Sequence, residues 1–447
     1  MDLPKGWVMC RLVDVNMVIA GQSPESKYYN ENGEGLPFFQ GKSDFGQTYP
    51  TNRVYCTAPK KLAECGDILL SVRAPVGPTN LTKETIAIGR GLNAIRPLGG
   101  ILTKHVLYYF KHIEPMLSGQ GTGTTFGAVT VDQVKNLDFI LPPLAEQHRI
   151  VAKIDTLFSK LDKGVETLQT IRQQLKTYRQ AVLKWAFEIR ENWRICKVSD
   201  IGEIRLGRQR TPAKISKDYP TKYIRAANIT ESGFDLGDVL EMEFTPDERE
   251  RYYLKHNDIV LSEASGSASQ VGKPAIWKEQ LPSCCIQNTV IRHRVNNENP
   301  EYVYWYYKFL YLSGVFARIV GGVGINHLGA KNFSGITINL APSEEQTQIV
   351  AYIESRLSVC DKLESIVDEN LAKAAAIRQS ILKKAFSGQL VPQDPDDEPA
   401  ELLLKRIKAG NPRRSPPDPC GSPPSEKAAR TMPLSGKGAN AKREVCQ

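Results

Sequence analysis

One segment of this sequence occurs twice. Residues 141–187 align with residues 340–386 without a gap. The first copy contains EQHRIVAKID from Glu146 and ends in QAVLKWAF, and the second contains EQTQIVAYIE from Glu345 and ends in QSILKKAF. Loops accept insertions readily, so two copies of 47 residues that match at both ends indicate a structure whose length matters.

Apolar residues in both copies recur at alternating steps of four and three, which is the period of a coiled-coil seam. In the first copy the core positions predicted in this way are Ile150, Ile154, Leu157, Leu161, Leu168, Ile171, Leu175, Tyr178, Val182 and Trp185. In the second copy they are Ile349, Ile353, Cys360, Leu363, Val367, Ala374, Ile377 and Ile381, together with polar Arg356, Asn370 and Lys384. Polar core residues favour a specific partner. We therefore predict two helices of about 60 Å that pair antiparallel with each other. The alternative is that each helix packs only on its own domain.

The segments before the two helices also correspond, although more loosely. GDILLS at 66–71 matches NDIVLS at 257–262, and both patterns are typical of a turn that leads into a buried strand. A helix is expected at 103–117, with a counterpart at 300–319. The fold class predicted is therefore α+β, with two mixed α/β domains separated and joined by two long antiparallel coiled-coil helices in a pseudo-twofold internal repeat. The expected boundaries are 1–140, 141–190, 191–339, 340–390, 391–409 and 410–447.

The formal net charge of +9 comes mainly from one end of the chain, since the residues from Lys405 onward contribute +7. A solvated basic tail explains this charge without any nucleic acid. The sequence contains no run of about twenty apolar residues and no charged and apolar leader. We expect a cytoplasmic protein without a membrane span.

Several enzyme signatures are incomplete. In GSASQVGKP, five residues separate Gly266 from Gly272 where a phosphate loop has four, and Pro274 replaces the Ser or Thr that holds Mg²⁺. In SGQGTGTTFG at 118–127, Phe126 occupies the last glycine position of a dinucleotide-binding motif. The nine cysteines form no CxxC pair, so we expect no metal site. These observations favour a binding protein.

The repeat resembles the specificity subunit of type I restriction-modification systems. The similarity lies in LPPLAEQ and LAPSEEQ at the helix starts, the QAVLKWAF and QSILKKAF ends, and SGQLVPQDPDDEPAELLLKRIKA at 387–409. It covers about residues 1–409. It implies that 1–140 and 191–339 are DNA target-recognition domains, that 141–190 and 340–390 are spacer helices, and that 391–409 is the C-terminal tail typical of the family. Residues 410–447 have no counterpart and are expected to be a disordered basic tail.

The resemblance also implies the partners and the division of labour. Each domain would recognise one half of a bipartite, asymmetric site in double-stranded DNA, and the helices would set the spacer and dock two methyltransferase subunits. Two restriction/translocase subunits would join through these partners. S-adenosylmethionine, ATP and Mg²⁺ are expected on the partner subunits only. This chain would be a non-catalytic recognition subunit with no cofactor of its own.

Candidate DNA-binding residues are those with side chains suited to base edges or phosphates. In the first domain they are Lys42, Ser43, Arg73, Thr122, Thr124 and Thr125. In the second domain they are Arg225, Asn228, Ser262, Ser265, Ser267, Ser269, Lys273, Asn326 and His327. Arg225 and Asn228 are the strongest, because Arg suits guanine and Asn suits adenine. Each of these residues also fits turn formation or an exposed surface.

Two other functions remain open. A coiled-coil scaffold without DNA recognition would show no sequence-dependent binding. A fused restriction and methylation enzyme would need methyltransferase motifs upstream, and the position of LPKGW directly after the first residues argues against it.

Overall fold

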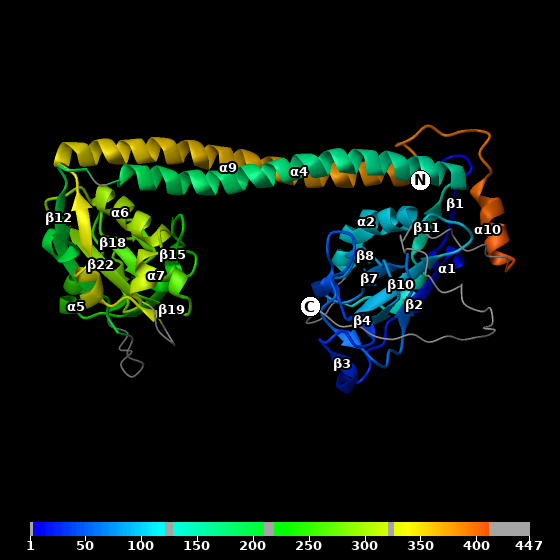
Figure 1. Cartoon of the computed structure of the whole chain (residues 1–447), viewed down its shortest axis with the longest axis horizontal. Helices are drawn as coiled ribbons and strands as arrows, with labels where there is room; N and C mark the ends of the chain where they lie inside the picture. The colour runs from blue at the N-terminus through cyan, green and yellow to red at the C-terminus, as the bar shows by residue number, and fades with distance from the viewer. Residues whose placement is uncertain (1–2, 121–127, 189, 210–218, 321–325, 411–447) are drawn as a thin grey trace, which may run out of the picture. The chain divides into compact units, whose positions relative to one another are not determined.

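The computed structural model describes residues 3–120, 128–188, 190–209, 219–320 and 326–410. The chain divides into two compact units. Unit 1 comprises Met1–Lys163 and Ala374–Gln447, and unit 2 comprises Gly164–Lys373. Figure 1 shows that each unit contains its own sheets and parts of both long helices, α4 (Leu144–Ala186) and α9 (Ser343–Phe386).

Unit 1 is built on a four-stranded antiparallel sheet in the order β2-β10-β7-β8, with a second sheet in the order β3-β5-β4-β9-β6. Its strands are β1 (Val8–Arg11), β2 (Asn16–Ala20), β3 (Tyr29–Asn30), β4 (Leu36–Phe39), β5 (Tyr55–Cys56), β6 (Leu62–Ala63), β7 (Ile68–Ser71), β8 (Thr79–Leu81), β9 (Ile86–Ile88), β10 (Leu92–Pro97) and β11 (Asp138–Leu141). Its other helices are α1 (Leu12–Val15), η1 (Ser26–Tyr28), η2 (Lys42–Asp44), α2 (Thr103–Gln120), α3 (Val131–Lys135) and α10 (Ala400–Lys408).

Unit 2 repeats this arrangement with a four-stranded antiparallel sheet in the order β13-β22-β18-β20 and a smaller sheet in the order β17-β14-β21. Its strands are β12 (Arg194–Lys197), β13 (Gly202–Leu206), β14 (Pro220–Ile224), β15 (Ile229–Thr230), β16 (Gly233–Phe234), β17 (Leu240–Glu243), β18 (Ile259–Ser262), β19 (Ala264–Ser265), β20 (Pro274–Ile276), β21 (Cys285–Ile286), β22 (Val290–Val295), β23 (Asn326–His327) and β24 (Thr337–Leu340). Its other helices are η3 (Val198–Ile201), η4 (Ala226–Asn228), α5 (Pro246–Tyr252), η5 (Ala268–Gln270), α6 (Pro300–Leu312), α7 (Val315–Ile319) and α8 (Ala330–Ser334).

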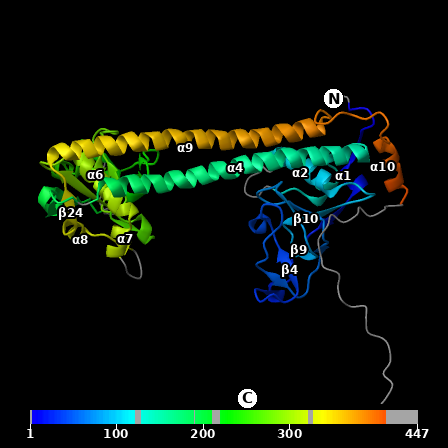
Figure 2. The same ribbon diagram turned by 45° about the horizontal axis from the view of Figure 1, so that its top comes forward.

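The helix expected at 300–319 is two helices, α6 and α7. Gly314 lies between them with a φ of +72°, a left-handed conformation that a continuing α-helix does not allow. In each unit one helix follows an inner strand of the four-stranded sheet, α2 after β10 and α6 after β22. This helix lies between the sheet and the long helices (Figures 1 and 2).

The repeated GD and ND turns are held by buried ion pairs. Asp67 is 2% exposed and accepts hydrogen bonds of 2.8 and 2.7 Å from Arg96 on β10. In unit 2, Asp258 is 1% exposed and accepts two hydrogen bonds of 2.8 Å from Arg294 on β22. A buried carboxylate requires a paired, hydrogen-bonded cation. Each turn therefore depends on an arginine that lies about thirty residues or more later in the chain.

The EQ pairs explain why the two decapeptides are alike, because they fix each long helix to its domain. Glu146 accepts a 2.8 Å hydrogen bond from the indole N–H of Trp7, and Glu345 accepts one of 3.2 Å from Trp193. Gln147 donates to the Pro142 carbonyl at 3.0 Å, and it accepts from the backbone N–H that precedes α2 at 3.3 Å. The equivalent glutamine in the second copy makes the same two types of contact with residues 341 and 299.

The two long helices pair antiparallel within each unit. In unit 2, Arg179 bonds to Asp361 at 2.6 Å, and seven residues earlier on α4 Arg172 pairs with Asp368, seven residues later on α9. In unit 1 the side chains of Ile154, Phe158, Leu382 and Phe386 share one core. Figure 2 shows the helices side by side.

The helices pair as predicted, but six of the 21 predicted core positions are exposed, and at each of them the next residue is less exposed. Ile154, Leu175 and Val182 on α4 are buried, as are Ile353, Cys360, Val367 and Ala374 on α9. The intervening predicted positions are more exposed, namely Tyr178, Trp185, Leu363 and Ile377 at 42–50%, and also Arg356 and Lys384. The residue that follows is the more buried one, as for Phe158, Arg179, Ala186, Leu357 and Arg378.

At two of these positions the cause is pairing between charged side chains. Arg179 and Arg378 face carboxylates of the opposite helix, Asp361 and Glu364 for the former and Asp162 for the latter. Their alkyl stems cover the seam, so arginines occupy positions that an apolar pattern assigns to Tyr178 and Ile377. Tyr178 and Ile377, each in its own unit, are consequently left 44% and 48% exposed.

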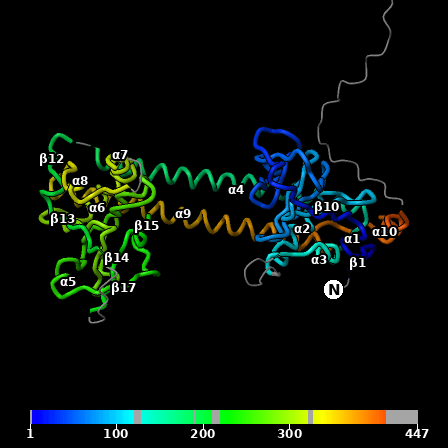
Figure 3. Tube along the Cα trace, turned by 90° about the horizontal axis from the view of Figure 1, so that it is seen from below, coloured from blue at the N-terminus to red at the C-terminus, as the bar shows by residue number. Residues whose placement is uncertain are grey.

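The segment after α9 returns to the start of the chain. Asp397 pairs with Arg149 at 2.5 Å, and Lys408 on α10 pairs with Asp14 at 3.2 Å. Leu403 and Ile407 of α10 are buried in the core of unit 1, and Figure 3 shows α10 beside α1. The tail expected at 391–409 therefore packs on unit 1, whereas most of 410–447 lies outside the described residues.

Candidate nucleic-acid interface

Two of the candidate segments of unit 2 meet at the end of strand β18. Ser265 on β19 lies opposite Asn326 on β23, and the N–H of Leu328 donates to the Glu263 carbonyl at 2.8 Å. Unit 1 has the same contact, because the N–H of Val129 donates to the Val72 carbonyl at 3.0 Å. The fold thus brings residues that are far apart in the sequence to one equivalent place in each unit.

His327 is held in position at this site by Glu263. The Nδ1 atom of His327 lies 3.1 and 3.2 Å from the two carboxylate oxygens of Glu263. An ionised carboxylate only accepts hydrogen bonds, so Nδ1 donates and Nε2 is left for another group. The His327 side chain is 56% exposed and that of Glu263 is 10% exposed. This ring is therefore fixed and presented to solvent.

The serines of the β18–β20 hairpin have two different roles. Ser262 is 4% exposed, donates to the Gln270 carbonyl at 2.6 Å and accepts from the Lys273 N–H at 3.0 Å, so it shapes the hairpin. Ser267 and Ser269 are exposed, and their hydroxyls lie 2.8 Å apart. Hydroxyls at an exposed hairpin are available to DNA, whereas that of Ser262 is already used.

Arg225 and Asn228 also differ from each other. Asn228 is 3% exposed, and its amide donates to the carbonyls of Asp235 and Asp238 at 3.0 Å each and accepts from the Arg225 N–H at 3.1 Å. This side chain holds a turn, and a base contact would require these bonds to break. Arg225 pairs with Asp238, whose side chain is 75% exposed, so its guanidinium lies near the surface with a defined orientation.

In unit 1, Lys42 and Ser43 are exposed on η2, and Arg73 is exposed after β7, where it forms a bridge with Ala128. Thr122, Thr124 and Thr125 lie outside the described residues. The structure therefore places Arg73 at the position equivalent to the β19–β23 contact of unit 2, and the role of all these residues in DNA binding stays a prediction.

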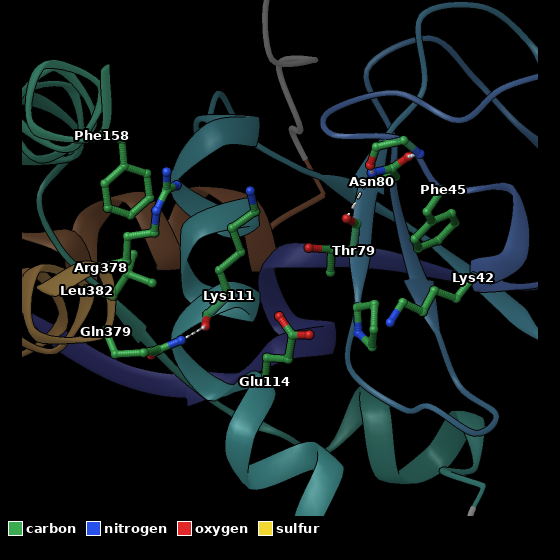
Figure 4. A pocket seen from close by; sticks show the side chains of 12 residues that line it. Lys42, Phe45, Thr79, Asn80, Lys111, Glu114, Phe158, Arg378, Gln379 and Leu382 are labelled. Carbon is green, nitrogen blue, oxygen red and sulfur yellow. Dashed lines mark hydrogen bonds between the residues drawn. The ribbon is translucent and has the colours of Figure 1, made fainter. Parts of the chain in front are cut away.

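Sequence reasoning named Lys42 but missed Lys111 and Arg378, which lie with it beneath the β7–β8 hairpin of unit 1. A pocket of about 350 Å³ is lined by Lys42, Lys111, Arg378, Glu114 and Thr79, among others. Figure 4 shows Arg378 on one side of the pocket and Lys42 on the other, with Lys111 and Glu114 of α2 between them. Burial lowers the pKa of Lys111 and raises that of Glu114.

The sequence signal for this group was a lysine that both copies place among aromatic residues. Lys111 in LYYFKHIE and Lys308 in YWYYKFLY are equivalent on α2 and α6. Burial also lowers the pKa of Lys308, whose ammonium donates to the Glu231 carbonyl at 2.6 Å. Arg378 and Arg179, which lie close to these lysines, occupy matching positions in the repeat.

Within the described residues, no group of three or more His, Cys, Asp or Glu is arranged to hold a metal ion. In the same part of the chain, no helix combines the length and the apolar character needed to cross a membrane.

Comparison with known proteins identifies relatives along most of the chain. A family model described as "Type I restriction modification DNA specificity domain" matches residues 4–177 and 190–370. The chain is 24% identical over 448 residues to the type I restriction enzyme EcoKI specificity subunit of Escherichia coli K12, covering 91% of this chain and 96% of that protein. It is 34% identical over 185 residues to the putative type I restriction enzyme MjaX specificity subunit of Methanocaldococcus jannaschii, a match that spans 41% of this chain and 43% of that protein.

Among solved structures, a chain from work on complex assembly and conformational transition of the type I R-M system superposes with a TM-score of 0.70. The identity is 20%, and the match covers 87% of this chain and all of that one. At this identity the similarity concerns the fold.

Proposed function

Because this chain belongs to the family of type I restriction modification DNA specificity proteins, we propose that its two domains, 1–140 and 191–339, each recognise one half of a bipartite, asymmetric DNA site. The observation that carries the proposal is the corresponding order of the four-stranded sheet in both units, combined with different side chains at the equivalent hairpins. Arg73 stands in one unit where Ser265, Asn326 and His327 gather in the other. Base recognition depends on such side chains, so unlike hairpins recognise unlike half-sites.

The chain is a recognition component and not a catalytic one. Its curated relatives are named as specificity subunits. We expect S-adenosylmethionine, ATP and Mg²⁺ to be held by partner subunits, and the two methyltransferase subunits to bring the two restriction/translocase subunits with them.

The long helices are suited to set the distance between half-sites. Each is continuous, with 43 residues in α4 and 44 in α9, which corresponds to about 65 Å. Half-sites recognised from one side of B-DNA lie about 34 Å apart for each helical turn. A helix pair of fixed length would therefore set the number of unrecognised base pairs between the two half-sites.

The helix pair also carries a surface suited to a helical partner. We call it the outer strip. Its members in unit 2 are apolar and 42–54% exposed, and they are Tyr178, Trp185, Val359, Leu363 and Ile366. Each of these residues immediately precedes a position that faces the opposite helix.

The members of the outer strip point to the same side of the pair. In antiparallel helices, residues that precede the seam by one position share one face, and the rings of Trp185 and Tyr352 accordingly lie 4.5 Å apart. Leu183 and Val350, which follow the seam, are buried against the core of unit 2. The strip thus lies away from the domain, and an apolar row at heptad spacing accepts an amphipathic helix. At the equivalent positions of the repeat stand Ile377, Lys384, Lys160, Gly164 and Thr167. The apolar strip is therefore a feature of unit 2 and supports the docking of a methyltransferase subunit there.

The decisive experiment is sequencing of methylated bases in cells that carry this gene and its methyltransferase partner. We expect one split motif that disappears when the gene is deleted. Replacement of residues 191–339 by the equivalent domain of a relative should change one half of the motif only. Unchanged methylation after deletion would favour the scaffold function instead.

A further inference from the structure

We propose that the pocket beneath the hairpin of unit 1, and the equivalent place around Lys308 in unit 2, each bind one phosphodiester group of the DNA backbone. The equivalent lysine of each repeat, half-buried Lys111 or buried Lys308, is the principal donor. This inference rests on the proposed function and adds a fixed backbone contact to it.

The first support is the lack of an acidic partner for Lys111. Among the described residues, the Lys111 ammonium forms no ion pair or hydrogen bond within the usual distances, although its surroundings lower its pKa by burial. Its neighbour Arg378 is neutralised by Asp162. The single carboxylate of Glu114 interacts electrostatically with two ammonium groups, those of Lys111 and Lys42. A buried cation that lacks its own counter-ion destabilises a fold, and a bound anion removes that cost.

The second support is the repeat itself. In unit 2, burial lowers the pKa of Lys308, the nearby Glu231 carboxylate raises it, and the nearby Lys273 and Arg179 lower it. Arg179 is paired with acids of α9, but in the described chain neither Lys273 nor Lys308 has a carboxylate partner within ion-pair distance. At the position of Glu114 stands Tyr311. Both units therefore place a lysine without an ion-pair partner, among the described residues, at the same position of the fold.

The third support is the connection to the hairpins. Ser71 donates its N–H to the Pro78 carbonyl at 2.9 Å, and Ser262 donates to the Lys273 carbonyl at 3.0 Å, so Pro78 and Lys273 are equivalent. Pro78 and Thr79 line the pocket, and the hydroxyl of Thr79 is buried without a hydrogen-bond partner among the described residues. One hairpin thus carries Arg73 at its tip and an unused hydroxyl in the pocket.

The ammonium and hydroxyl groups that line the pocket are of the kinds that bind phosphate. An ammonium and a hydroxyl are common donors to the phosphate oxygens of DNA, and such contacts fix orientation without specifying sequence. A volume of about 350 Å³ holds a phosphodiester with its water. A DNA duplex that is bound both at the hairpin tip and at the pocket could not rotate relative to the domain that binds it.

The test uses the full chain assembled with its methyltransferase partner. Dissociation constants are measured from low to high salt on a duplex with the methylated motif and on a duplex of random sequence, for wild type, Lys111→Met, Lys308→Met and the double variant. Each single variant should reduce the slope of log affinity against log salt by about 0.9, and the double variant by about twice that. Both duplexes should be affected equally, so that their affinity ratio is unchanged.

The matched control is Lys104→Met. Lys104 is two turns earlier on α2 and already pairs with Asp155 at 2.9 Å, so its loss should leave the salt slope unchanged. Thermal unfolding separates a structural role from a binding role. Removing a half-buried charge that has no ion-pair partner should leave the unfolding temperature of Lys111→Met equal or higher.

Three results would overturn the inference. The first is an unchanged salt slope in both lysine variants, and the second is a marked loss of stability in Lys111→Met. The third is a thermal shift with inorganic phosphate or ADP that Lys111→Met abolishes while DNA binding stays as in wild type, since this would assign the pocket to a free ligand. Failure of the proposed function is distinguishable, because the wild type would then bind both duplexes equally whatever the lysine variants do.

Discussion

Ile366 and Val367 are neighbours in the sequence with opposite environments, and this makes them a direct test of partner docking. Ile366 belongs to the outer strip and is 52% exposed, whereas Val367 faces the seam and is 3% exposed. We consider Ile366→Glu and Val367→Glu. The first should affect assembly with the methyltransferase subunit, and the second should affect the stability of the chain itself.

The magnitudes follow from exposure. Docking would bury the remaining half of the Ile366 side chain, worth about 1 kcal/mol, and a carboxylate at that place would add about 2 kcal/mol for an unpaired polar group. The dissociation constant should rise about 100-fold for a total near 3 kcal/mol. The isolated chain should change in stability by less than about 0.5 kcal/mol, as for most surface substitutions. Val367→Glu should cost about 3 kcal/mol or more in the free energy of unfolding.

Assembly is measured by isothermal titration of the methyltransferase subunit into each variant, and stability by thermal unfolding of the chain alone. The reasoning is wrong if Ile366→Glu binds the partner as tightly as wild type. It is equally wrong if Ile366→Glu unfolds as early as Val367→Glu, because the strip would then be part of the core.

Other predictions address spacing, pH and recognition. Insertion of one heptad into both α4 and α9 at paired positions lengthens the helix pair by about 10.5 Å and should move the half-sites of the methylated motif apart by about three base pairs. An unchanged gap after this paired insertion would argue against the spacer role. Insertion into α4 alone should prevent assembly, because Arg179 loses its partners. Burial lowers the pKa of His105 to about 3, so the unfolded chain binds a proton below about pH 6.5 that the folded chain does not, and stability should fall by about 1.4 kcal/mol for each pH unit below that value. His105→Leu should unfold with a flatter dependence between pH 7.5 and 5, and parallel curves would contradict this. Arg225→Ala should cost about 1–3 kcal/mol in DNA affinity and relax one base position, while Asn228→Ala should lower the unfolding temperature, and the reverse pattern would contradict the roles assigned here.

The candidate site was only partly predictable, because a side chain's role depends on which backbone groups lie near it. Asn228 and Ser262 have the chemistry of base recognition, but the carbonyls of Asp235, Asp238 and Gln270 occupy them. Conversely, the pairing of Ser265 with Asn326 and the Glu263 contact with His327 join segments about sixty residues apart. Sequence patterns carry no information about such distances.

The sequence by itself determined the two long helices and the equivalence of the two domains. Heptad spacing and the repeated GD, ND and EQ motifs are local patterns, and each reflects one recurring contact. Only the tertiary structure decided which side of each helix is buried, because Arg179 and Arg378 face the seam through acids on the opposite helix, where an apolar pattern favours Tyr178 and Ile377. It also brought Lys42, Lys111 and Arg378 together from three separate segments. Burial and charge pairing depend on neighbours that are distant in the chain, and for this reason they appear only in the folded molecule.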